Sequence, residues 1–275
     1  MSEPDWHRPR TIAEALALRS ELGDEALVIA GGTYIGVLLS TGLIAAPAAF
    51  VSLRGVEELR GLACNGGGLQ LGALVTHREV ESDPRVRAGG HVALADTFAA
   101  VANIRIRALA TVGGVLADAD YASDPPAMLC ALQAEAVLAS VRGERRLSIE
   151  QLILGHYETA IEPDELLVRV ELPPPVRATY LKFRSRSSED RPCVGVAVAL
   201  GSGLRVVVGA VAGRPQILPE VCALADGGEL DAALRDEIAA LYGERIEALG
   251  DLRGSEAYRR RITRVLVRRA LEAVA

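Results

Sequence analysis

The sequence lacks the patterns of a membrane segment. Half of its 275 residues are hydrophobic, yet no uninterrupted apolar run reaches about 18 residues. Residues 1–7, MSEPDWH, contain neither the basic region nor the apolar region of a secretory signal peptide. We therefore expect a globular cytoplasmic protein without a membrane span.

Cysteine and histidine are scarce, with four residues of each type. The cysteines form neither a C-x-x-C pair nor the C-x4-C-x2-C spacing of a ferredoxin cluster, and the histidines show no H-E-x-x-H or other paired-ligand spacing. These residues are Cys64, Cys130, Cys193, Cys222, His7, His77, His91 and His156. We expect no bound metal, and we expect the histidines at the surface or in turns.

An excess of positive charge is also absent. The formal net charge is −6, and no long block of one sign occurs before the C-terminal region. We therefore expect neither nucleic acid nor an anionic membrane as a partner. The arginines near the C-terminus (Arg259–Arg261, Arg264, Arg268 and Arg269) are compatible with a solvated helix face or with a docking surface for an acidic partner subunit.

Residues 11–55 have the pattern of a small α/β unit. Thr11 is placed to cap a helix over 11–23, with Glu14 as the second half of a capping box and Gly23 as its end. The apolar runs 27–30 and 49–53 read as strands, joined through a helical segment near 34–40. Strands linked by a helix are expected to be parallel.

Residues 56–172 mix antiparallel strands with helices. Hairpins are expected around Gly66–Gly68 and at Gly143-Glu144, a capped helix after Thr76, another helix over 92–101, and a strand over 166–172. Three prolines at 173–175 then mark the best domain boundary. We expect a first domain over 1–174, with subdomains of about 1–55 and 56–174, and a second domain over 175–275.

The second domain predicts a three-stranded antiparallel sheet backed by helices. Its strands are expected over 180–184, 194–200 and 204–211, and its clearest helices over 230–241 and 258–274. The chain as a whole therefore reads as α+β.

Two glycine pairs follow apolar runs and are candidates for anion binding. Gly31-Gly32 follows the run 26–30, and Gly113-Gly114 lies in the stretch 111–124. Glycine tolerates positive φ and lets a backbone approach a ligand, so successive N–H groups can converge on a phosphate. Two such segments suggest a ligand with two phosphates, although glycine pairs after strands are also common as plain turns.

Neither segment is a known nucleotide motif. Thr33 stands where the G-x-G-x-x-G fingerprint requires glycine, and Val37 and Leu38 stand where a P-loop requires lysine and serine or threonine.

Two charged residues are further candidates. Asp124 precedes Pro125-Pro126 and an apolar helix, so it fits an N-cap as well as a ligand contact. Lys182 lies on a predicted strand, where it is either a solvated outward residue or a cation that pairs with a phosphate or a reduced ring. No G-x-S-x-G elbow is present, so covalent catalysis is not expected.

Five short segments occur together in one order: Ala30-Gly-Gly-Thr33, the stretch 106–114, Ala122-Ser-Asp124, Asp164-Glu-Leu-Leu167 and Tyr180-Leu-Lys-Phe183. In this order and spacing the sequence resembles the FAD-binding medium subunit of the molybdenum hydroxylases, the family of xanthine dehydrogenase and aerobic carbon monoxide dehydrogenase. The resemblance covers essentially the whole chain. It implies a two-subdomain FAD-binding domain of the vanillyl-alcohol oxidase type, followed by a C-terminal sheet with a helix bundle.

The resemblance also implies which residues hold FAD. The first glycine segment is expected around the pyrophosphate and adenosine, the second segment and Asp124 at the phosphates and ribityl chain, and Leu167, Lys182 and the position of Val101 near the flavin ring. The full set is Ile29, Ala30, Gly31, Gly32, Thr33, Tyr34, Ile35, Val101, Thr111, Gly113, Gly114, Val115, Asp124, Leu167 and Lys182. Lys182 is the expected catalytic residue, as a cation that favours an anionic reduced flavin.

Three positions depart from the family pattern. Val115 replaces the asparagine that follows the glycine pair, which removes a side chain able to bond cofactor oxygens. The stretch 34–38, Tyr-Ile-Gly-Val-Leu, replaces a small polar residue and leucines, and Val101 stands where animal xanthine dehydrogenases place an aromatic residue.

The function implied by the resemblance is electron transfer within a complex. The chain is expected to pass electrons from the [2Fe–2S] clusters of a small subunit through FAD to NAD+ or another acceptor, beside a molybdopterin-binding large subunit. Two alternatives stay open: a stand-alone FAD-dependent oxidoreductase, and a scaffold subunit that has lost its flavin.

Overall fold

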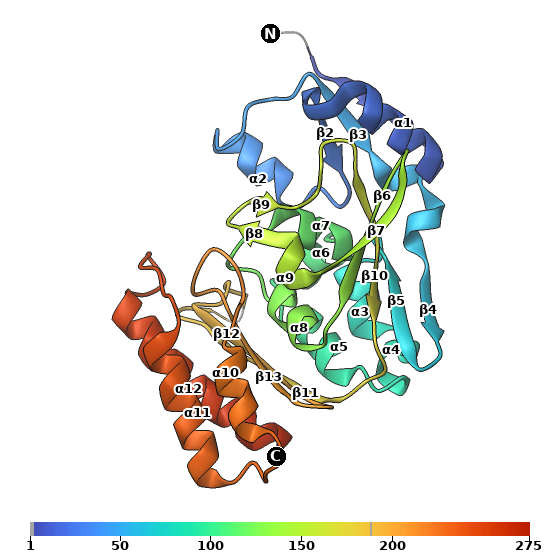
Figure 1. The fold of residues 1–275 in the computed structure, drawn as a ribbon. Helices are drawn as coiled ribbons and strands as arrows, with labels where there is room; N and C mark the ends of the chain where they lie inside the picture. Colours follow the sequence, from blue (N-terminus) through green and yellow to red (C-terminus); the bar gives the residue numbers. More distant parts are fainter. Residues whose placement is uncertain (1–2, 188) are drawn as a thin grey trace.

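The computed structural model describes residues 3–187 and 189–275. Three sheet-based parts follow one another along the chain, with the N-terminal part at the top of Figure 1 and the C-terminal helices at the lower left. In the described parts, every helix is too short or too polar to span a bilayer.

The N-terminal part is a parallel sheet with two helices, as expected, but it has a third strand, β1, that was not predicted. The strand order is β1-β3-β2. Its elements are β1 Asp5–His7, α1 Ile12–Leu22, β2 Ala26–Ile29, α2 Ile35–Ser40 and β3 Ala49–Ser52. The Thr11 hydroxyl caps α1 by accepting from the Glu14 amide at 3.1 Å. The capping box is incomplete, because the Glu14 carboxylate accepts from the Arg10 amide instead of the Thr11 amide.

The central part is an antiparallel five-stranded sheet in the order β4-β5-β10-β6-β7, with helices on one side. The strands are β4 Leu62–Asn65, β5 Gly68–Gly72, β6 Glu135–Ser140, β7 Gly143–Ser148 and β10 Leu166–Leu172, and β8 Ile153–Gly155 pairs with β9 Glu158–Thr159. The helices are α3 His77–Ser82, α4 Pro84–Ala88, α5 Val92–Ala99, α6 Ile104–Arg107, α7 Val112–Asp118, α8 Pro125–Ala131 and α9 Ile149–Leu152. Both predicted hairpins and the strand 166–172 are present, but the second hairpin turns at 141–142, and the expected turn residues Gly143 and Glu144 begin β7.

The C-terminal part is an antiparallel sheet in the order β11-β12-β13-β14. Its strands are β11 Arg177–Phe183, β12 Val194–Leu200, β13 Leu204–Gly209 and the two-residue β14 Gln216–Ile217, which adds a fourth strand to the three expected. Its helices are α10 Pro219–Cys222, α11 Ala232–Arg245 and α12 Glu256–Val274. The remaining short 3₁₀ turns cover 23–25, 53–55, 57–60 and 223–225.

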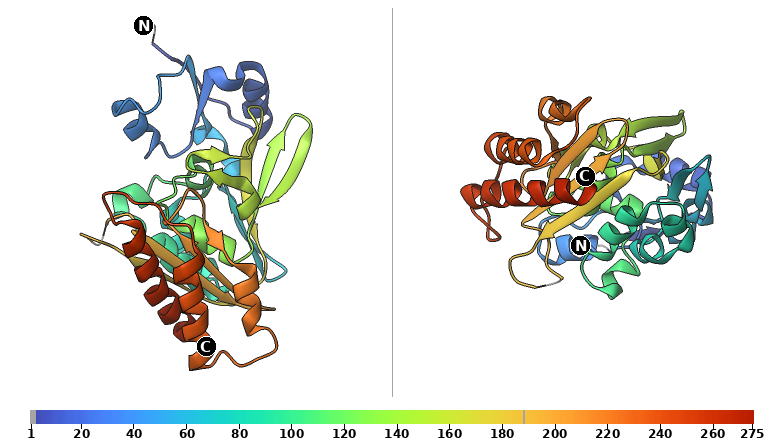
Figure 2. Two further views of the ribbon diagram at one scale, coloured as in Figure 1. Left: turned by 60° about the vertical axis from the view of Figure 1, so that its left-hand side comes forward. Right: turned by 90° about the horizontal axis from the view of Figure 1, so that it is seen from below.

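Alternation along β12 places this sheet between two layers. Val196 and Val198 belong to the core shared with α11 and α12, whereas Ala197 and Ala199 belong to the central core around α8. Figure 2 shows the C-terminal helices stacked on the outer face of the sheet. Small alanines on the inner face let the sheet lie close to α8, so the two halves of the chain share one interface.

The C-terminal arginines do not form one face. Arg259 is fully buried and donates to the carbonyl oxygens of Cys193 and Ala210, so it ties α12 to the sheet. Arg260 pairs with Glu256, and Arg268 with Asp236. The series is therefore split between a buried structural arginine and residues on the helix surface, where Arg261, Arg264, Arg268 and Arg269 are exposed.

The expectation of a surface or turn histidine was wrong for His77, which is buried in the first turn of α3. His91 is also buried, but it lies in the turn region between α4 and α5. The His77 ring packs edge-on against Phe98, with ring centroids 4.8 Å apart. The pKa of His77 is lowered to about 4, mainly because the ring is buried. Burial also lowers the pKa of His91.

Candidate functional site

The first glycine segment connects β2 to α2 and lies against the residues that precede the second segment. A Cβ at Gly31 would overlap the carbonyl oxygen of Leu109 and would lie 3.2 Å from Cα of Ala110. Only glycine therefore allows this close backbone approach. The fold thus brings residues 29–35 next to the residues that precede Thr111.

The turn after Gly31 carries free backbone donors. Gly32 has a φ of +70°, in the left-handed region expected for a glycine of this segment. The amides of Gly32, Thr33 and Tyr34 donate no hydrogen bond to any described residue. The three residues are exposed or partly exposed, so the turn offers a short row of N–H groups that an anion can use.

The second glycine pair differs from the prediction. Gly113 and Gly114 are not in the left-handed region but in the first turn of α7, which Thr111 caps. The Gly113 amide donates to the Ala73 carbonyl oxygen at 2.8 Å, and the Gly114 amide to the Thr111 hydroxyl at 3.0 Å. Both amides therefore already have partners within the protein, and contact of Gly113 and Gly114 with a phosphate stays a prediction.

Tight packing explains the glycines of this pair. A Cβ at Gly113 would lie 2.6 Å from Cβ of Ala73, and a Cβ at Gly114 would lie 2.8 Å from the Thr111 hydroxyl oxygen. The glycines therefore let α7 sit against the loop after β5 and keep its cap in place. Val115 follows them and is partly buried against the central core.

Asp124 and Lys182 form a buried ion pair between the two halves of the chain. Lys182 Nζ lies 2.9 Å from Asp124 Oδ2 and 3.0 Å from the carbonyl oxygen of Ala100. Each of the two charged side chains is 4% exposed. The Tyr180 hydroxyl donates to the other carboxylate oxygen of Asp124 at 2.7 Å.

This arrangement overturns the alternative explanations for both residues. Asp124 does not cap α8 with its side chain, because its carboxylate is turned toward β11. Lys182 is not a solvated outward residue, because α5 and α8 cover its face of the sheet. Burial raises the pKa of Asp124, and the Lys182 charge and the Tyr180 hydrogen bond oppose that rise.

The amino-acid composition also singles out Lys182. Lys182 is the only lysine in the chain, whereas arginine serves at every other basic position. A compact ammonium fits between Asp124 and the Ala100 carbonyl, where a planar guanidinium has a different shape and donor geometry. Tyr180 could also have been found, because residues two apart on a strand share a face.

The other two residues predicted near the flavin ring, Val101 and Leu167, lie in different parts of the structure. Val101 follows α5 directly after Ala100, so it adjoins the carbonyl that anchors Lys182. Leu167 is buried in the central core on β10, where a bulge follows it in the pairing with β6. Contacts of these two residues with a flavin ring stay predictions.

A second polar group, missed by the sequence reasoning, joins the first glycine segment to both halves of the chain. We call it the junction cluster: Tyr34, Asp120, Tyr157 and Arg191. The Tyr34 hydroxyl hydrogen-bonds to the Tyr157 hydroxyl, and the Arg191 guanidinium carbon lies 4.7 Å from the Tyr34 ring centroid. Arg191 also forms an ion pair with buried Asp120. The four residues are spread over positions 34 to 191 and share no local sequence pattern. Only the fold shows that they lie together.

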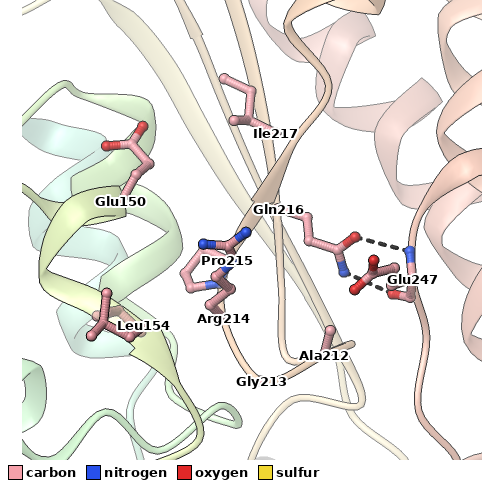
Figure 3. Close-up of a pocket in the computed structure, with 10 residues that line it drawn as sticks. Glu150, Leu154, Ala212, Gly213, Arg214, Pro215, Gln216, Ile217 and Glu247 are labelled. Carbon is pink, nitrogen blue, oxygen red and sulfur yellow. Dashed lines mark hydrogen bonds between the residues drawn. The ribbon is translucent and has the colours of Figure 1, made fainter. Parts of the chain in front are cut away.

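A cavity of about 470 Å³ lies elsewhere, between α9 and the loop from β13 to β14 (Figure 3). Gln216 spans one side of it through two hydrogen bonds to the backbone of Glu247. None of the predicted site residues lines this cavity. Among residues 3–187 and 189–275, no group of three or more potential metal ligands is present.

Comparison with known proteins covers the chain from end to end. The family described as "FAD binding domain in molybdopterin dehydrogenase" matches residues 2–175, and the family described as "CO dehydrogenase flavoprotein C-terminal domain" matches residues 178–274.

Two relatives and one solved structure match over nearly their whole length. The carbon monoxide dehydrogenase medium chain of Afipia carboxidovorans is 31% identical, over 98% of this chain and 95% of the relative. The nicotine 6-hydroxylase medium subunit of Paenarthrobacter nicotinovorans is 30% identical, over 96% and 94%. Among solved structures, a chain of quinoline 2-oxidoreductase from Pseudomonas putida 86 superimposes with a TM-score of 0.92 at 29% identity, over 99% of this chain and 97% of that chain.

Proposed function

Because the chain belongs to the FAD-binding medium subunits of the molybdenum hydroxylase family, we propose that it passes electrons from partner [2Fe–2S] clusters through FAD to NAD+ or another acceptor. FAD is its cofactor, and the chain is an oxidoreductase subunit. The proposed partners are a small iron–sulfur subunit and a large molybdopterin-binding subunit. The full-length similarity to chains named as medium subunits carries this proposal.

The first glycine segment fits the phosphates of FAD. The free amides of Gly32, Thr33 and Tyr34 can donate to phosphate oxygens without breaking any hydrogen bond to a described residue. Gly31 holds this turn against the chain before Thr111. We propose residues 29–35 as the phosphate-binding segment, with Thr111, Gly113, Gly114 and Val115 forming the wall beside it.

The buried ion pair is suited to hydrogen-bond the polar groups of FAD that lie near the flavin ring. Asp124 and Ala100 use two of the three N–H donors of Lys182, which leaves one donor without a partner among the described residues. The Asp124 carboxylate accepts two hydrogen bonds and retains lone pairs for cofactor hydroxyl groups. We propose that Asp124 accepts from the cofactor and that Lys182 donates to it, with Val101 and Leu167 shaping the apolar surroundings.

The flavin supplies chemistry that the side chains lack, because it exchanges electrons singly with one carrier and in pairs with another. The protein binds it, orients it and sets the local charge. Lys182 is the proposed cation that favours the anionic reduced form, and Asp124 controls how much of that positive charge is offset. The strength of this effect therefore depends on whether Asp124 is ionised.

Two further expectations remain as proposals. We propose a division into a FAD-binding domain over 1–174 and a second domain over 175–275. We also propose a cytoplasmic location, since all four cysteines are free in the structure and a reducing compartment suits unpaired thiols.

Anaerobic rapid-mixing spectroscopy tests the proposed electron path. The FAD-loaded chain is mixed with a separately reduced two-cluster [2Fe–2S] partner subunit, and the flavin absorbance is followed before NAD+ or a dye acceptor is added. Bleaching of the flavin after mixing, and its recovery with acceptor, support the proposal. A flavin that stays oxidised in a complex shown to have assembled, yet is reduced directly by a small substrate, would identify a stand-alone oxidoreductase.

A further inference from the structure

Tyr180 is the least expected member of the buried group around Asp124. Its side chain extends from β11 on the same face as Lys182, two residues away. The two residues divide the Asp124 carboxylate between them, Tyr180 at Oδ1 and Lys182 at Oδ2. A carboxylate bonded at both oxygens has a fixed orientation, whereas one bonded at a single oxygen can rotate about its last torsion.

The neighbouring strand is shaped to admit the Tyr180 hydroxyl. Gly195 on β12 pairs with Lys182 in the sheet, and a Cβ at position 195 would overlap the Tyr180 hydroxyl oxygen and lie 3.1 Å from its ring carbon Cζ. Gly195 has an ordinary backbone conformation, so the absence of a side chain is needed for space alone. The fold therefore leaves room on one strand for a hydroxyl that another strand directs at Asp124.

We propose that Tyr180 is a positioning residue of the FAD site, which fixes the Asp124 carboxylate in its ionised form and thereby sets Lys182 for the cofactor. This inference rests on the function proposed above and concerns the binding site of that function. Tyr180 acts through Asp124 and need not touch the cofactor itself.

The charged and titratable groups that face Asp124 are few. Among the described residues they are Lys182 and Tyr180 in direct contact and Arg184 just after the end of β11, while Ala100 at the end of α5 contributes its carbonyl to Lys182. The hydrogen bond from Tyr180 opposes the rise that burial causes in the pKa of Asp124. Removal of the hydroxyl therefore moves the protonation of Asp124 to higher pH.

The test compares Tyr180→Phe, Gly195→Ala and the control Tyr258→Phe, whose ring packs against Phe183 and Arg261. The flavin-free full-length chains carry ¹³C-carboxyl aspartate, and the resonance lost in Asp124→Asn identifies Asp124. We expect the titration midpoint of Asp124 to rise by about one pH unit in Tyr180→Phe and Gly195→Ala, and to stay in place in Tyr258→Phe. Unchanged midpoints in the first two variants would overturn the proposal.

A second measurement connects this shift to the cofactor. FAD affinity is measured by flavin fluorescence across the same pH range, and the acid limb of the wild-type profile should move to higher pH in Tyr180→Phe by the same amount. An affinity that falls by one factor at every pH would show a merely structural role and would also overturn the proposal. Because the aspartate titration needs neither FAD nor a partner subunit, failure of the proposed electron path gives a different result from failure of this inference.

Discussion

Lys182 and Asp124 lie 58 residues apart in sequence and meet in a buried ion pair with Nζ and Oδ2 separated by 2.9 Å. One residue comes from β11 of the C-terminal sheet and the other from the start of α8 in the central part. The pair therefore joins the two halves of the chain at the place where the FAD site is proposed. Its effect on stability and on cofactor binding can be measured separately.

Loss of one member of the ion pair should destabilise the protein far more than loss of both members. Lys182→Met leaves the Asp124 carboxylate buried without its cation, so we expect the free energy of unfolding to fall by about 3–5 kcal/mol. The double variant Lys182→Met/Asp124→Leu should recover most of that loss, because it buries no unpaired charge. Urea unfolding followed by circular dichroism measures both. A double variant that is as unstable as the sum of the single variants would contradict this interpretation.

The single lysine allows the site to be mapped chemically. An amine-reactive reagent has only Lys182 and the N-terminal amine as targets in this chain. We expect Lys182 to react much more slowly than the N-terminal amine, since its side chain is 4% exposed, and to react still more slowly when FAD is bound. Peptide mass spectrometry of time points gives both rates. A Lys182 rate that FAD does not change would argue against contact between them.

Gly31 in the first glycine segment and Gly36 in the helix that follows it should respond in opposite ways to alanine. Gly31→Ala forces a side chain into the Leu109 carbonyl, so we expect a loss of about 1–3 kcal/mol of stability together with weaker FAD binding. Gly36→Ala meets nothing within 4 Å and lies inside α2, so it should be neutral or stabilising by about 0.5–1 kcal/mol. Unfolding curves and FAD titrations of both variants check the contrast. Equal losses in the two variants would mean that the close approach at Gly31 is not the cause.

Buried His77 should make the protein less stable in mild acid. Its pKa is about 4 in the folded chain, below about 6.5 for an unperturbed histidine, so between these values the unfolded chain binds a proton that the folded chain does not. The free energy of unfolding therefore decreases as the pH falls through this window, by up to about 3 kcal/mol from this group.

The variant His77→Leu isolates that contribution. Its stability should depend less steeply on pH than that of the wild type between pH 6.5 and 4, and the two slopes should agree above pH 7. Urea unfolding at several pH values gives the slopes. Parallel curves for the two proteins across the acid window would contradict a depressed pKa at His77.

Local sequence patterns predicted much of the fold because they follow burial. The strand 166–172 was predicted with its observed bounds, since its buried residues are followed by three prolines that cannot continue a ladder. The parallel pairing of β2 and β3 followed from the helix that connects them, whereas β1 was not predicted. The cap of α3 at Thr76 is a complete capping box with Glu79 and was also visible in the sequence.

The second glycine pair shows where local reasoning fails. Glycine is a poor helix former, so Gly113-Gly114 reads as a turn, yet the pair lies in the first turn of α7. Carbonyl groups of Ala73 and Val75, about 40 residues earlier, accept the first amides of that helix and stabilise it. Tertiary hydrogen bonds thus decided a conformation that propensity alone does not predict.

The polar groups of the site depend on contacts between distant parts of the chain. The sequence singled out Asp124 and Lys182 separately, but it did not show that they pair, because the packing of α5 and α8 against this face of the C-terminal sheet is a tertiary contact. The junction cluster was missed for the same reason, since Arg191 reaches Asp120 and Tyr34 across the interface.

Equilibrium titration of the flavin-free chain with FAD, followed by quenching of flavin fluorescence, tests the central claim most directly. We predict one FAD bound per chain in the wild type, and an affinity at least about tenfold lower in Lys182→Met and in Asp124→Asn, each of which removes a charged partner of the proposed site. Wild-type affinity in both variants, or no FAD binding by the wild-type chain, would contradict the assignment of this ion pair to the FAD site.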